Sequence, residues 1–329
     1  MNTVKISCFV ICLLLGSYLT SCTMTPNALP YAQGDAGDVL VVMRDNLWRG
    51  ACGDSVRQCF SEPARDISFL EPAFSLSHQV GLTRTFQRFR NILIVNIDQG
   101  FEYADLGYKT DMYARNQLIF NIDAPSADSA IACLYRSRQL ITARFLLNDR
   151  DAIIEDYRRI EDKLVTEKLR EKFQVDVIIP KPYKVGMEKD DFIWIDREEG
   201  ERIRGILMWK EPYVRKTQLD TDSLIFKMNA ITRKYVPGNI PGSYMADEPT
   251  VPPVVKRFEK EGVYSVQMNG LWQMENGFMG GPYVSQTIID IQRGQLVTAL
   301  GFVFFPNRDK RLMVRQLEAI LYTMTPTEE

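Results

Sequence analysis

The sequence predicts an α+β fold with mixed, largely antiparallel sheets and a long helical pair in the middle of the chain. Short apolar segments of strand length occur in both halves, and a stretch with helical spacing of apolar residues separates them. Segments rich in Pro and Gly punctuate the strands. Both halves also follow a similar order of elements, so two tandem β-α-β-β-β-α halves are a working hypothesis.

In the first half, residues 39–43 form a fully apolar strand candidate, and residues 74–80 alternate as a half-buried strand does. Asp54 is expected to cap a short helix over residues 54–60. Ser126 is expected to cap the long helical region, which runs to about residue 172 with a break at Asn148 and Asp149. Two more strands are expected at residues 92–97 and 117–122.

The second half is expected to be rich in strands. A helix is predicted over residues 222–235, a Pro- and Gly-rich loop over 236–253, and a closing helix over 308–324. Gly294 marks the turn of the last hairpin. Strands are predicted at 175–179, 192–196, 204–209, 254–258, 264–274, 283–291 and 296–305.

The N-terminus carries the signature of a lipoprotein signal. Lys5 precedes an apolar run over residues 6–15, which is too short to span a membrane. Leu19-Thr20-Ser21-Cys22 then resembles a bacterial lipobox, in which the cysteine is lipidated. We therefore expect a membrane partner, reached through lipid on Cys22. A retained membrane anchor and a simple secretory signal remain open as alternatives.

These features divide the chain into a signal peptide (1–21), a lipidated tether (22–37), a first half (38–174) and a second half (175–329). Thr23 stands where an aspartate would resemble an inner-membrane retention signal, and the first acidic residue after Cys22 is Asp35. By resemblance to such sorting signals, we expect an outer-membrane anchor facing the periplasm.

Composition excludes several classes of function. The 40 basic and 42 acidic residues nearly balance, which disfavours a nucleic-acid partner. The single histidine, His78, rules out sites that need two imidazoles, and on a polar strand face it is expected to be a surface or hydrogen-bonded residue rather than a ligand. Phosphate-binding glycine motifs and nucleophile-elbow motifs are absent from the sequence. No catalytic, metal or cofactor site is therefore predicted.

Three cysteines remain after signal removal: Cys52, Cys59 and Cys133. Burial as small apolar residues is the main expectation. A disulfide between Cys52 and Cys59 is an alternative, as is a lowered pKa at Cys52 if it directly precedes a helix.

An aromatic and glycine-rich segment in the second half is the candidate binding cleft. Trp272, Phe278 and Tyr283 would line it, and Gly280 and Gly281 would let a backbone or ligand approach closely. The expected occupant is an envelope protein or a glycan. Packing of the aromatic residues in the core is the competing interpretation.

Two other functions remain open. An envelope hydrolase could use Cys52 or a carboxylate pair, either Asp190-Asp191 or Glu198-Glu199. The other is a purely structural envelope component, which would need neither a catalytic site nor a ligand-binding site. The lack of a catalytic grouping favours a binding or assembly factor over an enzyme.

Several short motifs, in this order along the chain, resemble an uncharacterised lipoprotein family of Bacteroides-type bacteria, known as a domain of unknown function. The resemblance implies an envelope lipoprotein and assigns no active-site residue. The motifs are the lipobox, Gly37-Asp38-Val39-Leu40-Val41-Val42, Arg90-Asn91-Ile92, Phe192-Ile193-Trp194, Met279-Gly280-Gly281-Pro282 and Gln316-Leu317-Glu318-Ala319-Ile320-Leu321.

Overall fold

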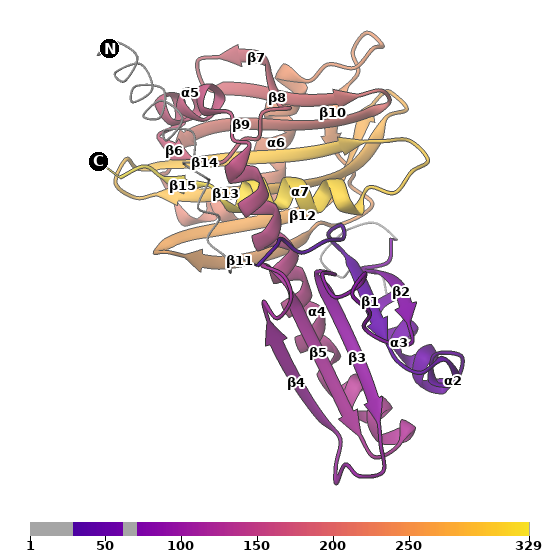
Figure 1. Cartoon of the computed structure of the whole chain (residues 1–329). Coiled ribbons are helices and arrows are strands. Elements are labelled where there is room, and N and C mark those ends of the chain that lie inside the picture. Colours follow the sequence, from indigo (N-terminus) through magenta and orange to yellow (C-terminus); the bar gives the residue numbers. More distant parts are fainter. Residues whose placement is uncertain (1–28, 62–70, 329) are drawn as a thin grey trace, which may run out of the picture.

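One long helix, α4 (Ala127–Arg159), connects a small sheet to a much larger one (Figure 1). The computed structural model describes residues 29–61 and 71–328. The predicted signal peptide and Cys22 lie outside these residues. The fold is α+β, and most strand pairs are antiparallel, as the sequence predicts.

The first sheet has five strands in the order β2-β1-β3-β5-β4. Its three central strands are parallel and almost fully buried, which explains their continuous apolar sequences. β4 was not predicted, because it is an exposed antiparallel edge strand without an apolar pattern. The strands are β1 (Asp38–Val42), β2 (Ser75–Gln79), β3 (Asn91–Ile97), β4 (Asp105–Thr110) and β5 (Leu118–Ala124).

Helix α3 (Ala51–Ser61) and the first half of α4 cover one face of this sheet. The short helix α2 (Asp45–Trp48) precedes α3, which begins earlier than predicted and contains Asp54 in its first turn. Phe145 of α4 meets the rings of Phe60, Phe74 and Phe120 at centroid distances of 6.3, 6.1 and 5.4 Å. This aromatic cluster fixes α4 on the first sheet.

The start of α4 is the one predicted. The Ser126 hydroxyl accepts a hydrogen bond from the Ser129 backbone N–H, and the Ser129 hydroxyl accepts one from the Ser126 backbone N–H, which makes a reciprocal cap. The predicted break at Asn148 and Asp149 is wrong, because α4 continues to Arg159. α5 (Lys163–Phe173) follows, with Asp162 as its N-cap.

The second sheet has eight strands, and all of its pairs are antiparallel. Its order is β10-β12-β13-β14-β9-β8-β7, with β11 also paired to β12. Strands β7 and β10 were not predicted. The strands are β7 (Lys184–Lys189), β8 (Phe192–Glu199), β9 (Arg202–Pro212), β10 (Tyr244–Asp247), β11 (Val254–Lys260), β12 (Val263–Glu275), β13 (Gly280–Asp290) and β14 (Gln295–Phe304).

Each face of this large sheet packs on a helix. α7 (Arg311–Tyr322) covers β13 and β14 on one face, where Val284, Ile288 and Val303 join the core shared with the first sheet. α6 (Thr221–Tyr235) follows a short 3-10 helix, η2 (Lys216–Leu219), and covers a second core on the opposite face.

The tandem-duplication hypothesis is wrong. The first sheet is mainly parallel and receives its strands in the order β2-β1-β3-β5-β4, whereas the second is an antiparallel sheet of different order. Similar orders of elements along the chain therefore produce two unrelated topologies.

The described part of the predicted tether lies on the first half. Tyr31 and Gln33 form isolated bridges with Arg115 and Phe89, and Ala36 is buried. The other residues of the predicted tether, 22–28, lie outside the described residues.

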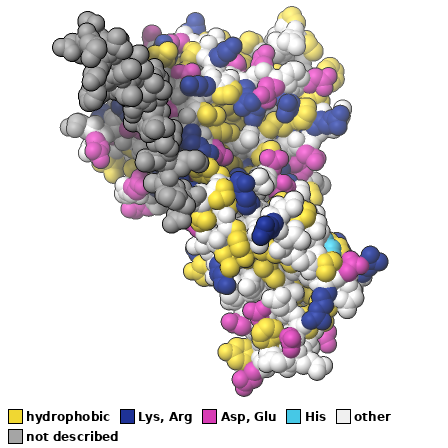
Figure 2. Space-filling model, in the orientation of Figure 1, with side chains coloured by type: hydrophobic (Ala, Val, Ile, Leu, Met, Phe, Trp, Pro, Cys, Tyr) yellow, Lys and Arg dark blue, Asp and Glu magenta, His cyan; other side chains and the backbone are white. Residues whose placement is uncertain are grey.

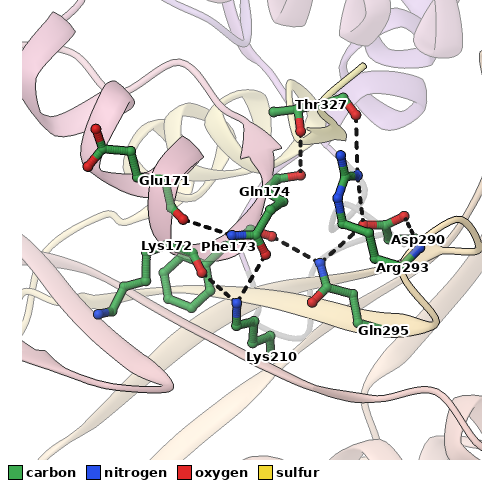
Figure 3. A network of polar contacts seen from close by, with 9 residues as sticks. All are labelled: Glu171, Lys172, Phe173, Gln174, Lys210, Asp290, Arg293, Gln295 and Thr327. Atoms are coloured by element: carbon green, nitrogen blue, oxygen red, sulfur yellow. Dashed lines mark hydrogen bonds and ion pairs between the residues drawn. The ribbon is translucent and has the colours of Figure 1, made fainter. Parts of the chain in front are cut away.

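A polar network ties the end of α5 to the large sheet (Figure 3). Lys210 of β9 donates to the carbonyl of Lys172 at 2.7 Å and to Oε1 of Gln174 at 3.0 Å. Burial and the nearby Lys172 charge lower the pKa of Lys210. Gln174 caps α5 in a left-handed conformation, with φ at 56°.

The same network holds the C-terminal segment (Figure 3). The Thr327 backbone N–H donates to the Gln174 carbonyl at 3.0 Å, beside the two-stranded pair of β6 (Val175–Asp176) and β15 (Thr325–Pro326). Arg293 bridges the buried Asp290 carboxylate and the Thr327 carbonyl. The chain end is thereby fixed to the β13–β14 turn.

Within the described residues, none of the helices combines the length and the apolar character of a membrane span.

We predict that Phe145→Ala lowers the free energy of unfolding by about 3–5 kcal/mol, because it leaves a cavity among three rings. Urea denaturation of the full chain measures the change. Phe226→Ala, at an exposed position of α6, is the control and should change stability by less than about 0.5 kcal/mol. Equal losses in the two variants would contradict the assigned packing of α4.

Candidate functional site

The structure places Trp272 and Tyr283 of the predicted cleft in the core between the large sheet and α6. The Trp272 indole donates to the Val303 carbonyl at 3.2 Å, and its ring meets Phe302 edge-on. The Tyr283 hydroxyl donates to Oδ1 of Asp247 at 2.7 Å. Burial, followed by the Asp247 charge and this hydrogen bond, raises the pKa of Tyr283 above its ordinary value.

The glycines of the predicted cleft make this packing feasible. Gly280 and Gly281 pair with Gln273 and Trp272 across the β12–β13 ladder. A Cβ atom on Gly281 would lie 2.1 Å from the Val303 carbonyl oxygen, the acceptor of the Trp272 hydrogen bond. Phe278, by contrast, is 99% exposed in the turn before β13. Of these five residues, Phe278 is the aromatic side chain available to a partner, and its binding role stays a prediction.

The predicted carboxylate pair Glu198-Glu199 lies at the end of β8, next to the connection to β9, where an exposed hairpin turn was expected. Burial alone would raise the pKa of Glu199. The hydrogen bond from Arg197 and the charge of Arg204 outweigh burial, and the pKa lies below its usual value. A general acid requires the opposite shift. In the other predicted pair, Asp190-Asp191, the Asp191 carboxylate accepts a hydrogen bond from the Tyr235 hydroxyl.

The cysteines follow the main expectation. Cys52, Cys59 and Cys133 are all buried, and no disulfide joins them. Cys52 lies inside α3 rather than ahead of it, and burial raises the pKa of its thiol. The lowered pKa considered for Cys52 is therefore wrong, and with it the activated nucleophile.

His78 is hydrogen-bonded, as expected. Its Nε2 lies 3.0 Å from the Met43 carbonyl, and its ring stacks on Trp48 at 4.7 Å. Among the residues that the structure describes, no group of three or more metal-binding side chains gathers.

A buried carboxylate that the sequence did not single out lies in the middle of α4. Asp149 is 2% exposed. Its two oxygens accept hydrogen bonds from the Gly37 backbone and the Asn91 amide, both at 2.8 Å. Nη1 of Arg90 lies 3.8 Å from Oδ1 of Asp149. Asp149 therefore joins the start of the first half, strand β3 and helix α4.

The surroundings of Asp149 set its protonation. Burial raises the pKa of this carboxyl to about 6, even though the hydrogen bond from Gly37, the Arg90 charge and the Asn91 hydrogen bond each favour the ionised form. A buried carboxyl with such a pKa near a cavity is a functional-site candidate.

Asp149 lines a cavity of about 250 Å³ between α4, α7 and β11. One wall is apolar and comes from α4. The other carries charged side chains from three elements. The lining residues are Ala143, Leu146, Leu147, Asp149, Arg150, Ile153, Lys256, Arg315 and Glu318.

The charged wall is organised around Glu318 of α7. Its carboxylate accepts hydrogen bonds from Arg315 at 3.0 Å and from Gln267 of β12 at 2.7 Å. Nζ of Lys256 lies 3.9 Å from Oε1 of Glu318. Lys256 of β11 pairs in register with Gln267 of β12. Glu318 is therefore held by cations and an amide, which fixes the shape of this wall.

Arg150 of α4 also lines the cavity. Its guanidinium lies 3.6 Å from the centroid of the Tyr322 ring, which fixes the side chain by a cation–π contact. Its Nε is buried, makes no hydrogen bond among the described residues and lies 3.5 Å from the carboxylate of Asp151. Arg150 therefore adds a positive charge in a fixed position to the cavity lining.

The sequence contained one signal for this site. Asp149 follows Ile141 and Phe145 at helical spacing, so a charged residue falls on the buried stripe of α4. Local pattern alone predicts a helix break at this position, because Asn148 and Asp149 are poor helix formers. Its partners at positions 37, 91, 315 and 318 are remote in sequence, and no local pattern connects them.

Two family models match the chain. Residues 32–158 match a family described as a domain of unknown function (DUF8532), and residues 162–323 match another (DUF4837). Both matches are to domains of unknown function, which is consistent with the expected uncharacterised family, although two models rather than one cover the chain. No curated protein matches the chain.

Several solved structures resemble part of the fold. Residues amounting to 47% of this chain resemble 91% of the Ran-binding protein Mog1p of Saccharomyces cerevisiae, with 8% identity and a TM-score of 0.33. The same share resembles 83% of LpqN of Mycobacterium tuberculosis, described as involved in cell envelope biogenesis, with 12% identity and a TM-score of 0.29. Human STARD10 gives 10% identity and a TM-score of 0.25, over 49% of this chain and 75% of that one.

We predict that Gly281→Ala lowers the free energy of unfolding by about 1–3 kcal/mol, because the added Cβ collides with the Val303 carbonyl. Gly107→Ala, in edge strand β4, is the matched control, since a Cβ there meets open space. Chemical denaturation followed by tryptophan fluorescence measures both. An unchanged Gly281→Ala variant would contradict the close approach of β14.

We also predict that Asp149 gives stability a specific pH dependence. Its folded pKa of about 6 lies above the ordinary value of 3.8, so the protonated form favours the folded state. The stabilisation is fully present below pH 3.8 and is lost as pH rises through 6, a change of about 3 kcal/mol. Denaturation at several pH values, compared with Asp149→Asn, measures it.

The exposed neighbour Asp151 supplies the control for this experiment. Asp151→Asn should keep the pH profile of the natural chain, whereas Asp149→Asn should flatten it between pH 4 and 7. Identical profiles for the natural chain and Asp149→Asn would show that Asp149 keeps its ordinary pKa.

Proposed function

We propose that this chain is a bacterial envelope lipoprotein, held at a membrane through lipid on Cys22, and that it works by binding. The observation that carries the anchor is the lipobox Leu19-Thr20-Ser21-Cys22 directly after a short apolar run. Each buried methylene contributes about 0.8 kcal/mol, and two or more acyl chains anchor stably where one does not. The modification of a lipoprotein cysteine supplies such a set of chains.

An outer-membrane location facing the periplasm belongs to the same proposal. Thr23 follows the cysteine where an aspartate would signal retention at the inner membrane, and no acidic residue precedes Asp35. A chain placed this way would act on envelope partners as an assembly or accessory factor.

Binding is supported by the cavity beside Asp149. Its apolar wall and its fixed cations provide the combination of contact surface and orienting charge that is typical of ligand sites. Phe278 offers a second, exposed contact for a protein or glycan partner. The site needs no covalent chemistry to perform this role.

An envelope hydrolase is the second candidate, and one observation favours it. Asp149, with a pKa raised to about 6, shares the cavity with a second carboxylate, Glu318. Both Asp149 oxygens already accept hydrogen bonds from Gly37 and Asn91, and Glu318 is held by Arg315 and Gln267. These engagements favour a structural and binding role for the two carboxylates.

We predict that Cys22→Ala abolishes incorporation of radiolabelled palmitate and moves the protein from the membrane fraction to the soluble fraction. The thiol is the acylation point, so its loss removes the acyl chains that hold the chain at the bilayer. Labelling of cells followed by fractionation and immunoprecipitation measures both effects.

Cys12→Ala is the matched control, because Cys12 lies within the apolar run that precedes the lipobox. This variant should be labelled and retained at the membrane like the natural chain. Palmitate incorporation that persists in Cys22→Ala would overturn the proposed anchor.

A further inference from the structure

We propose that the cavity between α4, α7 and β11 binds a short aliphatic carboxylate, with its chain against α4 and its charge toward Arg150 and Lys256. The inference rests on the proposed binding function and names the ligand class of its cavity. Three features of the described residues carry it: the size of the cavity, its apolar wall and its cations.

Size restricts the ligand. The cavity measures about 250 Å³, below the range of roughly 300–1,000 Å³ that holds drug-sized ligands. An engineered cavity of about 150 Å³ accommodates benzene, with six heavy atoms. By proportion, this cavity accommodates about ten heavy atoms, which corresponds to an acid of six to eight carbons.

The apolar wall selects a hydrocarbon chain. The adjacent Leu146 and Leu147, and Ile153 almost two turns later, all belong to α4 and line the cavity. Leu147 is 41% exposed, so its side chain still has apolar surface to bury. A methylene chain laid along this wall gains the free energy of leaving water.

The charged wall selects an anion. Arg150, Lys256 and Arg315 contribute three positive charges to the lining, against the two carboxylates Asp149 and Glu318. Arg90 lies 3.8 Å from Asp149, and Glu318 has two cations near it, Arg315 at 3.0 Å and Lys256 at 3.9 Å. With three cations against two carboxylates, the lining carries one more positive side chain than negative ones.

Arg150 provides the clearest docking point. Tyr322 holds its guanidinium in place, and its buried Nε makes no hydrogen bond among the described residues. This Nε lies 3.5 Å from the carboxylate of the exposed Asp151, which is outside the cavity lining. A ligand carboxylate would compete with this long, solvent-exposed contact and form a shorter, charge-assisted hydrogen bond with the guanidinium.

Figure 2 shows apolar and basic side chains interspersed over the middle of the molecule, where the two sheets meet. The cavity lies at this junction, because α4 carries the first sheet and α7 covers the second. A ligand there would contact both halves of the protein.

Equilibrium dialysis of radiolabelled hexanoate against the full chain in lipid nanodiscs tests the proposal, with empty nanodiscs as the blank. We expect a Kd on the order of 0.1 mM, as suits a ligand of eight heavy atoms. Hexanamide keeps the shape without the charge, and acetate keeps the charge without the chain. Each should bind at least about tenfold more weakly.

Two pairs of variants locate the site. Lys256→Gln should weaken hexanoate binding by about tenfold, whereas Lys163→Gln, at an exposed lysine of α5, should leave it unchanged. Leu147→Ala should weaken it by about fivefold, whereas Leu164→Ala, at an exposed leucine of α5, should not. A thermal melt of each variant confirms that it folds.

Equal binding of hexanoate and hexanamide would overturn the proposal, as would binding that neither cavity variant weakens, or no binding above the blank. Palmitate labelling at Cys22 is measured independently. A labelled, membrane-bound chain that does not bind hexanoate would therefore refute the ligand class and leave the anchor intact.

Discussion

The packing of α4 against the first sheet and against α7, which covers the large sheet, is the constraint on which the rest of the structure depends. Just past its midpoint, the helix buries Phe145 among the rings of the first half, and near its end it places Ile153 and Tyr157 in the same continuous core. That core continues under α7 to Val284 and Ile288 of the large sheet. Two sheets of different topology thereby share one apolar interior.

A helix that serves two sheets must cross the junction between them, and there the apolar stripe of α4 gives way to Asp149. Its hydrogen bonds with Gly37 and Asn91 secure the start of the first half to the middle of the helix. Burial raises its pKa, so this junction gains stability when the carboxyl is protonated.

The functional interpretation combines a chemical signal at one end of the chain with a cavity near the junction. In the proposed function, lipid on Cys22 would hold the protein at a membrane, and the cavity would supply the contact with a ligand. The buried thiols, the low pKa of Glu199 and the hydrogen bonds of Trp272 and Tyr283 assign structural roles to most of the residues that the sequence had marked. Phe278 retains the exposure that a partner would need.

The sequence by itself determined the elements whose signals are local. The reciprocal cap at Ser126, the central strands and the burial of the three cysteines follow from neighbouring residues and from side-chain chemistry. Only the tertiary structure decided that the first sheet is mainly parallel, that α4 passes through Asp149 unbroken, and that Asp149, Lys256 and Glu318 line one cavity. The reason is physical: strand pairing and cavity walls depend on contacts between distant segments, whose free energy no short window of sequence contains.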